Sequence, residues 1–256
     1  MRRKILGVIP ARFASSRFPG KVLAPISSKP MLQHVYERAC RARYLTSTII
    51  ATDDERVFAA ARQFGAAVRM TRADHLSGTD RVAEVASAEA AEIVVNIQGD
   101  EPLIDPDAID AAILPLEHDA EVVMATLKKE IEDRREVNDP NVVKVVTDGA
   151  GDALYFSRYP IPFAREGQDS PHYKHIGLYV YRRRFLLDYS SLPVGPLEQA
   201  ERLEQLRALE NGYKIRVVET EYESLGVDTP ADLERVSQLM ETTVGQVSSL
   251  SGARVK

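Results

Sequence analysis

The chain has 256 residues, of which 44% are hydrophobic and 28% charged, and it carries a formal net charge of −5. These values exclude a disordered or collagen-like chain, and the acidic balance argues against general nucleic-acid binding. The single cysteine, Cys40, excludes an intrachain disulfide, and no apolar stretch is long enough for membrane insertion, so we expect a soluble cytoplasmic protein.

Short apolar runs rich in β-branched residues alternate with amphipathic segments along the chain. The apolar runs predict strands at 5–9, 48–52, 93–97, 122–126, 142–147, 153–157, 176–181 and 214–219. The amphipathic segments predict helices at 30–41, 54–64, 80–90, 105–116, 196–211 and 230–240. This alternation is typical of a three-layer, Rossmann-like α/β fold with a mostly parallel central sheet.

The alternation weakens between about 120 and 190, where one strand follows another. We interpret this region as antiparallel strands added to the same sheet, which could serve a subunit contact. We expect one domain over 1–240 and a flexible tail over 241–256, because the tail lacks hydrophobic periodicity.

The segment after the first strand, 10–21, holds three cations on a loop with one glycine and two prolines: Arg12, Arg17 and Lys21. Open α/β sheets bind ligands at the carboxyl ends of their strands, and Arg and Lys are the usual partners of phosphate. The loop is not a Walker A motif, because Ser15 and Val22 stand where that motif needs Gly and Ser or Thr. We predict a phosphate site here, with a basic surface loop as the alternative.

Two carboxylates follow the predicted strand 93–97, at Asp100 and Glu101. Mg²⁺ prefers one or two carboxylates together with substrate phosphates, so this turn could hold a cation; a plain polar turn is the alternative. Late in the chain, Thr229, Pro230 and Asp232 read as a helix start. Asp228 is left over, and it could complete the cation site with Asp100.

Polar side chains also gather in two further parts of the chain. In 71–81, Thr79 could cap the next helix, while Arg72 and Ser77 could contact a base or a phosphate; a solvated loop is equally compatible. The second part combines strand ends with the helix 196–211, and it could form a pocket for a second, hydroxyl-rich and acidic substrate; its residues are Arg158, His175, Tyr179, Glu198, Glu204, Gln205 and Arg207. The helical spacing of Glu201, Glu204 and Arg207 favours the alternative, ordinary ion pairs on one helix face.

Taken in order from about residue 5 to 240, these segments resemble the 3-deoxy-manno-octulosonate cytidylyltransferase (CMP-KDO synthetase) family. The resemblance rests on 11–21, 71–79, 96–102, 154–158, 174–177, 196–198, 203–207 and 226–230. It implies a homodimer with the nucleotidyltransferase fold. The implied reaction couples CTP with 3-deoxy-manno-octulosonate (KDO), using Mg²⁺, to give CMP-KDO and pyrophosphate for lipopolysaccharide synthesis.

The resemblance also implies site residues. CTP would be bound by Ala11, Arg12, Arg17, Lys21, Thr71, Arg72, Ser77, Gln98 and Asp100. The sugar acid would contact Gln98, Arg158, His175, Tyr179, Glu204 and Gln205. The catalytic residues would be Arg12, Lys21, Asp100 and Asp228, with the two aspartates holding Mg²⁺. Two alternatives stay open: an enzyme that activates another acid sugar, such as a sialic acid or 8-amino-KDO, and a catalytically silent nucleotide-binding homologue.

Overall fold

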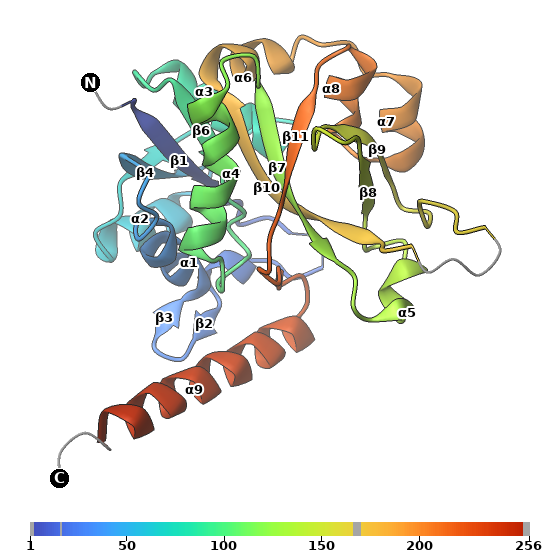
Figure 1. Cartoon of the computed structure of the whole chain (residues 1–256). Helices are drawn as coiled ribbons and strands as arrows, with labels where there is room; N and C mark the ends of the chain where they lie inside the picture. Colours follow the sequence, from blue (N-terminus) through green and yellow to red (C-terminus); the bar gives the residue numbers. More distant parts are fainter. Residues whose placement is uncertain (1–2, 16, 166–169, 253–256) are drawn as a thin grey trace.

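A computed structural model of the chain describes residues 3–15, 17–165 and 170–252 (Figure 1). Its central sheet has the strand order β11-β7-β10-β6-β1-β4-β5. The strands are β1 (Ile5–Pro10), β4 (Ser47–Thr52), β5 (Val68–Met70), β6 (Ile93–Asn96), β7 (Met124–Glu130), β10 (Tyr173–Arg182) and β11 (Ile215–Glu219). β6, β1, β4 and β5 run parallel, whereas β10 is antiparallel to both β6 and β7.

The added antiparallel strands lie where the sequence predicts them. β8 (Lys144–Thr147) and β9 (Ala153–Ser157) form an antiparallel pair that joins β10 through Lys174 and Lys144. β11 returns parallel to β7. The predicted α/β class, a mostly parallel sheet with antiparallel additions, is confirmed.

Side-chain alternation along the central strands supplies both faces of the sheet with apolar residues. On β1, Ile5 and Ile9 join the core on one face, while Leu6 and Val8 join the core on the other. α1 (Met31–Ala39), α2 (Glu55–Gln63) and α4 (Pro106–His118) cover the first face. α3 (Gly78–Ser87), α6 (Arg183–Tyr189) and α8 (Leu206–Glu210) cover the second. The result is three layers with a strand buried on both faces at their centre.

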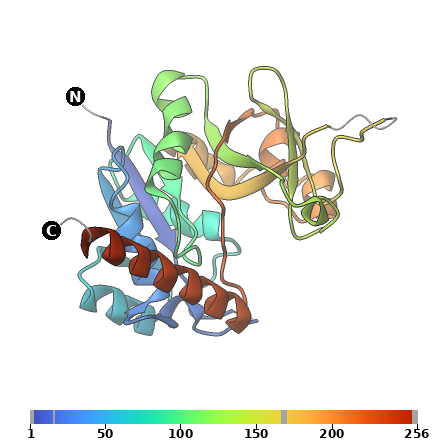
Figure 2. The same cartoon turned by 60° about the horizontal axis from the view of Figure 1, so that its bottom comes forward.

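Several predicted boundaries are wrong. The single helix predicted over 196–211 is two helices, α7 (Pro196–Glu201) and α8, because Arg202 takes a left-handed conformation with φ 54°. The helix after Thr229, α9 (Pro230–Gly252), continues past the predicted end at Met240 (Figure 2). The rest of the predicted tail, 253–256, lies outside the described residues.

Short elements without a full apolar period escape prediction: η1 (Lys21–Leu23), β2 (Pro25–Ile26), β3 (Lys29–Pro30), β5, α5 (Arg134–Val137) and α6. Thr79 is not the cap of α3. Ser77 caps it in a reciprocal box with Asp80, and Thr79 lies one residue inside the helix. Within the described residues, no helix is long and apolar enough to cross a membrane.

Candidate active site

The carboxyl ends of β1 and β6 meet at one edge of the sheet, because the two strands are parallel neighbours. The segments that follow them line a cavity of about 370 Å³, which we name the strand-end pocket. It is lined by Pro10, Arg12, Ala14, Ser15, Arg17, Lys21, Val22, Gly78, Gln98, Gly99 and Asp100. Five residues of the implied nucleotide set therefore lie together: Arg12, Arg17, Lys21, Gln98 and Asp100.

Gly99 allows the two segments to approach each other. A Cβ at this position would lie 2.8 Å from the carbonyl oxygen of Pro10, closer than real Cβ contacts. Glycine at this position therefore allows the segments after β1 and β6 to pack against each other. Any larger residue would push apart the two walls of the pocket.

Lys21 lines the strand-end pocket and lies between two carboxylates from distant parts of the chain. Its Nζ donates to Asp100 Oδ2 at 2.6 Å, to Asp228 Oδ1 at 2.9 Å and to the Val227 carbonyl at 3.0 Å. Burial alone lowers the pKa of Lys21, but the adjacent Asp100 and Asp228 outweigh this and raise it. The ammonium group is therefore charged, and it neutralises a pair of carboxylates that would otherwise repel each other.

Arg17 binds one carboxylate of this pair, Asp228, from the surface. Its Nη2 lies 2.8 Å from Asp228 Oδ2, and its side chain is 65% exposed, whereas that of Lys21 is 12% exposed. The two cations thus differ in place: Lys21 is enclosed between the carboxylates, and Arg17 caps one of them at the surface.

The oxygen atoms that surround Lys21 Nζ are also suitable ligands for a hard divalent cation. They are two carboxylate oxygens and one carbonyl oxygen, the ligand type that Mg²⁺ prefers. Across 3–15, 17–165 and 170–252, no three His, Cys, Asp or Glu side chains converge on one point. A cation held by Asp100 and Asp228 would take its remaining ligands from substrate and water, as Mg²⁺ commonly does.

Arg12 connects the strand-end pocket to the segment that begins α3. Its Nη2 donates to the carbonyls of His75, at 2.8 Å, and Ser77, at 3.1 Å. The hydroxyl of Ser77 is occupied as the cap of α3, since it accepts from the Asp80 amide. Arg72, on the same segment, pairs with Asp74 at 3.0 Å.

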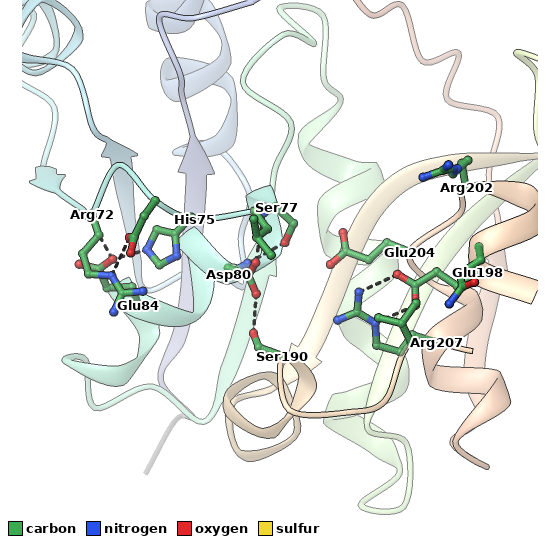
Figure 3. Close-up of a pocket in the computed structure, with 14 residues that line it drawn as sticks. Arg72, His75, Ser77, Asp80, Glu84, Ser190, Glu198, Arg202, Glu204 and Arg207 are labelled. Atoms are coloured by element: carbon green, nitrogen blue, oxygen red, sulfur yellow. Dashed lines mark hydrogen bonds and ion pairs between the residues drawn. The ribbon is translucent and has the colours of Figure 1, made fainter. Parts of the chain in front are cut away.

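This segment and α7 enclose a second cavity of about 960 Å³, which we name the helix pocket (Figure 3). Figure 3 shows Arg72, His75 and Glu84 on one side and Glu198, Arg202 and Arg207 on the other. Glu204 lines the same pocket. The lining is rich in charged and hydroxyl groups, so the pocket suits a polar ligand.

One wall of the helix pocket is fixed by a two-pronged ion pair across the break between α7 and α8. Arg207 Nε and Nη2 donate to the two carboxylate oxygens of Glu198 at 2.8 and 2.6 Å. The predicted pairing of Arg207 with Glu201 and Glu204 is wrong. The break at Arg202 takes Glu201 off the helix face of Arg207, and the guanidinium group of Arg207 is taken up by Glu198 although Glu204 lies one turn before it. Glu204 instead accepts from Thr79 at 3.3 Å, and burial raises its pKa.

Comparison with known proteins identifies the family. The cytidylyltransferase family pattern matches residues 6–215. A 3-deoxy-manno-octulosonate cytidylyltransferase of Solibacter usitatus is 77% identical over 96% of this chain and 98% of its own length. The chain belongs to the 3-deoxy-manno-octulosonate cytidylyltransferase family. Another member, from Geobacter sulfurreducens, is 56% identical over 93% of this chain and 99% of its own length.

Solved structures agree with this assignment. A CMP:2-keto-3-deoxy-manno-octonic acid synthetase complexed with CTP superposes with a TM-score of 0.91 at 47% identity, covering 94% of this chain and 99% of its own. A 4-diphosphocytidyl-2C-methyl-D-erythritol synthase from Anaerococcus prevotii has a TM-score of 0.64 at 13% identity, covering 94% and 100%. The second likeness shows a shared fold only.

Three of the sugar contacts implied by the family lie near the joint between β6 and β10. Gln98 Nε2 donates to the Gly177 carbonyl at 2.8 Å. The ring of His175 packs against the rings of Phe156 and Tyr179, with distances between ring centroids of 5.0 Å and 5.4 Å. Burial lowers the pKa of His175 to about 3, so its ring is neutral at ordinary pH.

Of the six implied sugar contacts, only Glu204 lines the helix pocket and only Gln98 lines the strand-end pocket; Arg158, His175, Tyr179 and Gln205 line neither. Arg158 donates from Nε to the Glu201 carbonyl at 2.7 Å and from Nη1 to the Pro140 carbonyl at 2.9 Å. Gln205 is buried. In this structure both side chains face protein groups, and a role toward a sugar stays a prediction for each.

Two implied nucleotide contacts, Ala11 and Thr71, are also buried. The hydroxyl of Thr71 donates to the Thr52 carbonyl at 3.0 Å and accepts from Arg81. Arg81 escapes sequence reasoning although it is fully buried and pairs with Asp53 at 2.7 Å. A usable signal exists: Arg81 shares the buried face of α3 with Val82 and Val85, where a cation needs a carboxylate partner from a strand end.

Proposed function

We propose that this chain is a nucleotidyltransferase that couples CTP with KDO to give CMP-KDO and pyrophosphate. The observation that carries the proposal is the meeting of Arg12, Arg17 and Lys21 with Asp100 and Asp228 at one strand end. Support comes from full-length relatives named for this activity and from the similar synthetase complexed with CTP.

The cations of the strand-end pocket are suited to a triphosphate. Arg12 uses only Nη2 for the described carbonyl contacts, so its Nε and Nη1 are left to donate to phosphate oxygens. Lys21 supplies a compact charge that can offset the negative charge growing on the phosphoryl oxygens during transfer. Asp100 and Asp228 would hold Mg²⁺, which supplies Lewis-acid neutralisation of phosphate charge when bound.

The proposed reaction is attack by the anomeric hydroxyl of the sugar on the α-phosphorus of CTP, with pyrophosphate leaving in line. Such a transfer needs positioning and charge neutralisation rather than a protein nucleophile. The proposed sugar contacts are Gln98, Arg158, His175, Tyr179, Glu204 and Gln205. Nε2 of the neutral His175 ring already contacts the Thr126 hydroxyl at 2.9 Å, which leaves the other ring nitrogen to exchange a hydrogen bond with a sugar hydroxyl.

The same proposal includes a homodimer in the cytoplasm. Three large apolar side chains close to the β8–β9 pair support a subunit contact, since Leu154 is 62%, Tyr159 79% and Phe163 89% exposed. Sedimentation equilibrium tests the dimer: a monomer at micromolar concentration would contradict it.

The function is tested by pyrophosphate release with CTP and Mg²⁺, comparing KDO, a sialic acid and no sugar, with EDTA as the control. We expect release only with KDO, abolished by EDTA. Release with another acid sugar would keep the phosphate site but replace KDO as substrate. CTP binding without release for any sugar would favour a silent nucleotide-binding subunit.

Asp100→Ala provides the matched test of the site. We expect it to lower turnover by far more than tenfold, which is about 1.4 kcal/mol, while leaving the circular dichroism spectrum unchanged. Turnover within tenfold of the parent chain would remove Asp100 from the catalytic set.

A further inference from the structure

The ammonium group of Lys21 stands where a divalent cation would bind. Asp100 Oδ2, Asp228 Oδ1 and the Val227 carbonyl all lie within 3.0 Å of Nζ. These are the same carboxylates that the proposed function assigns to Mg²⁺. Mg²⁺ holds its oxygen ligands at about 2.1 Å, so an ion on these atoms would overlap the ammonium group.

We propose that Lys21 is a built-in counter-ion that fills the divalent-cation site in the nucleotide-free chain and leaves it only when a triphosphate arrives. The inference rests on the proposed function for the identity of the ligand that draws Lys21 away. It adds a role that Lys21 plays before any substrate is bound.

The alternative destination for Lys21 is present in the same cavity. Lys21 lines the strand-end pocket beside Arg12 and Arg17, so phosphate oxygens bound there lie within reach of a flexible four-carbon side chain. An ammonium group exchanges one set of anionic oxygens for another at small cost, because both sets neutralise it. Once Lys21 has left, the two aspartates keep, among the described residues, only the exposed Arg17 as a counter-charge, and the enclosed position between them favours a divalent cation.

The consequence is that nucleotide and metal bind in a coupled manner. In the nucleotide-free chain the metal must displace a bound cation of like charge, so its affinity is low. Nucleotide binding removes the competitor, and by thermodynamic linkage the metal strengthens nucleotide binding by the same factor. The charge of the site stays near balance in both states.

The test measures Mn²⁺ binding to the full chain without nucleotide, using the electron paramagnetic resonance signal of free Mn²⁺. Mn²⁺ accepts the same oxygen ligands as Mg²⁺. We expect weak binding to the parent chain and at least about tenfold tighter binding to Lys21→Met, because the competing charge is gone. Adding Asp100→Asn to Lys21→Met should reverse the gain.

Arg17→Met is the matched control, because it removes one positive charge that touches Asp228 without standing between the carboxylates. Occupancy by Lys21 predicts a gain below about threefold for this exposed, solvent-screened charge. Lys21→Gln, which keeps a hydrogen-bond donor at the site, serves as a second variant if Lys21→Met does not fold.

Three results would overturn the inference: parent chain and Lys21 variants with equal Mn²⁺ affinity, an equal gain from Arg17→Met, or a gain that survives Asp100→Asn. The assay contains no CTP or sugar. The Mn²⁺ result therefore does not depend on whether the chain turns over KDO. Either proposal can be contradicted while the other stands.

Discussion

The carboxylate of Glu210 lies against Gly195, over the first turn of α7. It accepts hydrogen bonds from the backbone amides of Leu197, at 2.8 Å, and Glu198, at 3.0 Å. A Cβ at Gly195 would lie 2.3 to 2.4 Å from the carboxylate atoms of Glu210. A side chain from α8 thus caps α7, and the absence of a side chain at Gly195 makes room for it.

Gly195→Ala should therefore lower the free energy of unfolding by about 1–2 kcal/mol, because it forces the Glu210 carboxylate off the helix end. Urea denaturation measures the change. The backbone of Gly195, with φ −90°, accepts alanine without strain, so the cost should come from the lost cap alone.

A double variant tests whether the cost of Gly195→Ala comes from the lost Glu210 cap or from another effect of the substitution. In a Glu210→Ala background the cap is already gone, and Gly195→Ala should then cost nothing or stabilise slightly by restricting the unfolded chain. An equal cost in both backgrounds would show that the glycine is needed for some reason other than Glu210.

The buried carboxyl group of Glu101 should make the free energy of unfolding depend on pH. Burial, the largest cause, together with the charge of Asp100, raises the pKa of Glu101 to about 7 from its ordinary 4.5. Tyr222 donates to its Oε2 at 3.0 Å. Because the folded-state pKa exceeds the unfolded value, the folded chain holds this proton more tightly. Stability is therefore lost as pH rises from about 4.5 to about 7.

Glu101→Gln should abolish this part of the pH dependence, since glutamine keeps an acceptor for Tyr222 and never ionises. The loss removed is at most about 3 kcal/mol, from 1.36 kcal/mol per pKa unit. Urea denaturation at pH 5 and pH 7.5 measures it. We expect the parent chain and the variant to be alike at pH 5 and the variant to be more stable at pH 7.5.

The sequence predicts the central strands well because burial on both faces leaves a strong apolar signal. β1, β6 and β9 fall within one or two residues of the predicted ranges. β5 and α6 lack such a signal: Val68–Met70 has three residues, and α6 begins within a run of arginines. The break at Arg202 escapes prediction for another reason, since its left-handed backbone, with φ 54°, occurs at an arginine and not at the glycine that usually marks such a break.

The strand-end part of the site is predictable because topology alone brings the ends of β1 and β6 together. The sequence also suggests that Asp228 joins Asp100, but it does not indicate that the ammonium group of Lys21 lies between the two carboxylates. Sequence reasoning about Thr71 and Arg158 misses that both side chains have protein partners in this structure. These partners are set by segments that meet only in the folded chain, so the residue types and their spacing do not indicate them.

Substitutions of Arg207 and Glu198 should have large and non-additive effects on the free energy of unfolding. Both side chains are mostly buried, at 15% and 11% exposure, and hydrogen bonding to Glu198 raises the pKa of Arg207. Arg207→Met should lower the free energy of unfolding by about 3 kcal/mol, because it leaves a buried carboxylate unpaired. Adding Glu198→Gln should recover part of this loss. Additive costs in the double-mutant cycle would contradict a coupled pair.

Arg158 tests whether a residue with partners in the fold also binds the sugar. Arg158→Ala should raise the KM for KDO by at least about tenfold, the worth of one charge-assisted hydrogen bond, and leave the KM for CTP within about twofold. Arg158→Lys keeps the charge but cannot hold the Glu201 and Pro140 carbonyls together. Its KM for KDO should therefore lie between that of the parent chain and that of Arg158→Ala.

The unfolding free energies of the same Arg158 variants decide the interpretation. If Arg158 acts only through the fold, both substitutions should lower stability and raise both KM values together, because Glu201 and the turn at Arg202 shift with it. If it also meets the sugar carboxylate, Arg158→Lys should lose as much stability as Arg158→Ala yet retain more KDO affinity. An unchanged KM for KDO in both variants would remove Arg158 from the sugar site and leave Glu204 and Gln98 as its polar anchors.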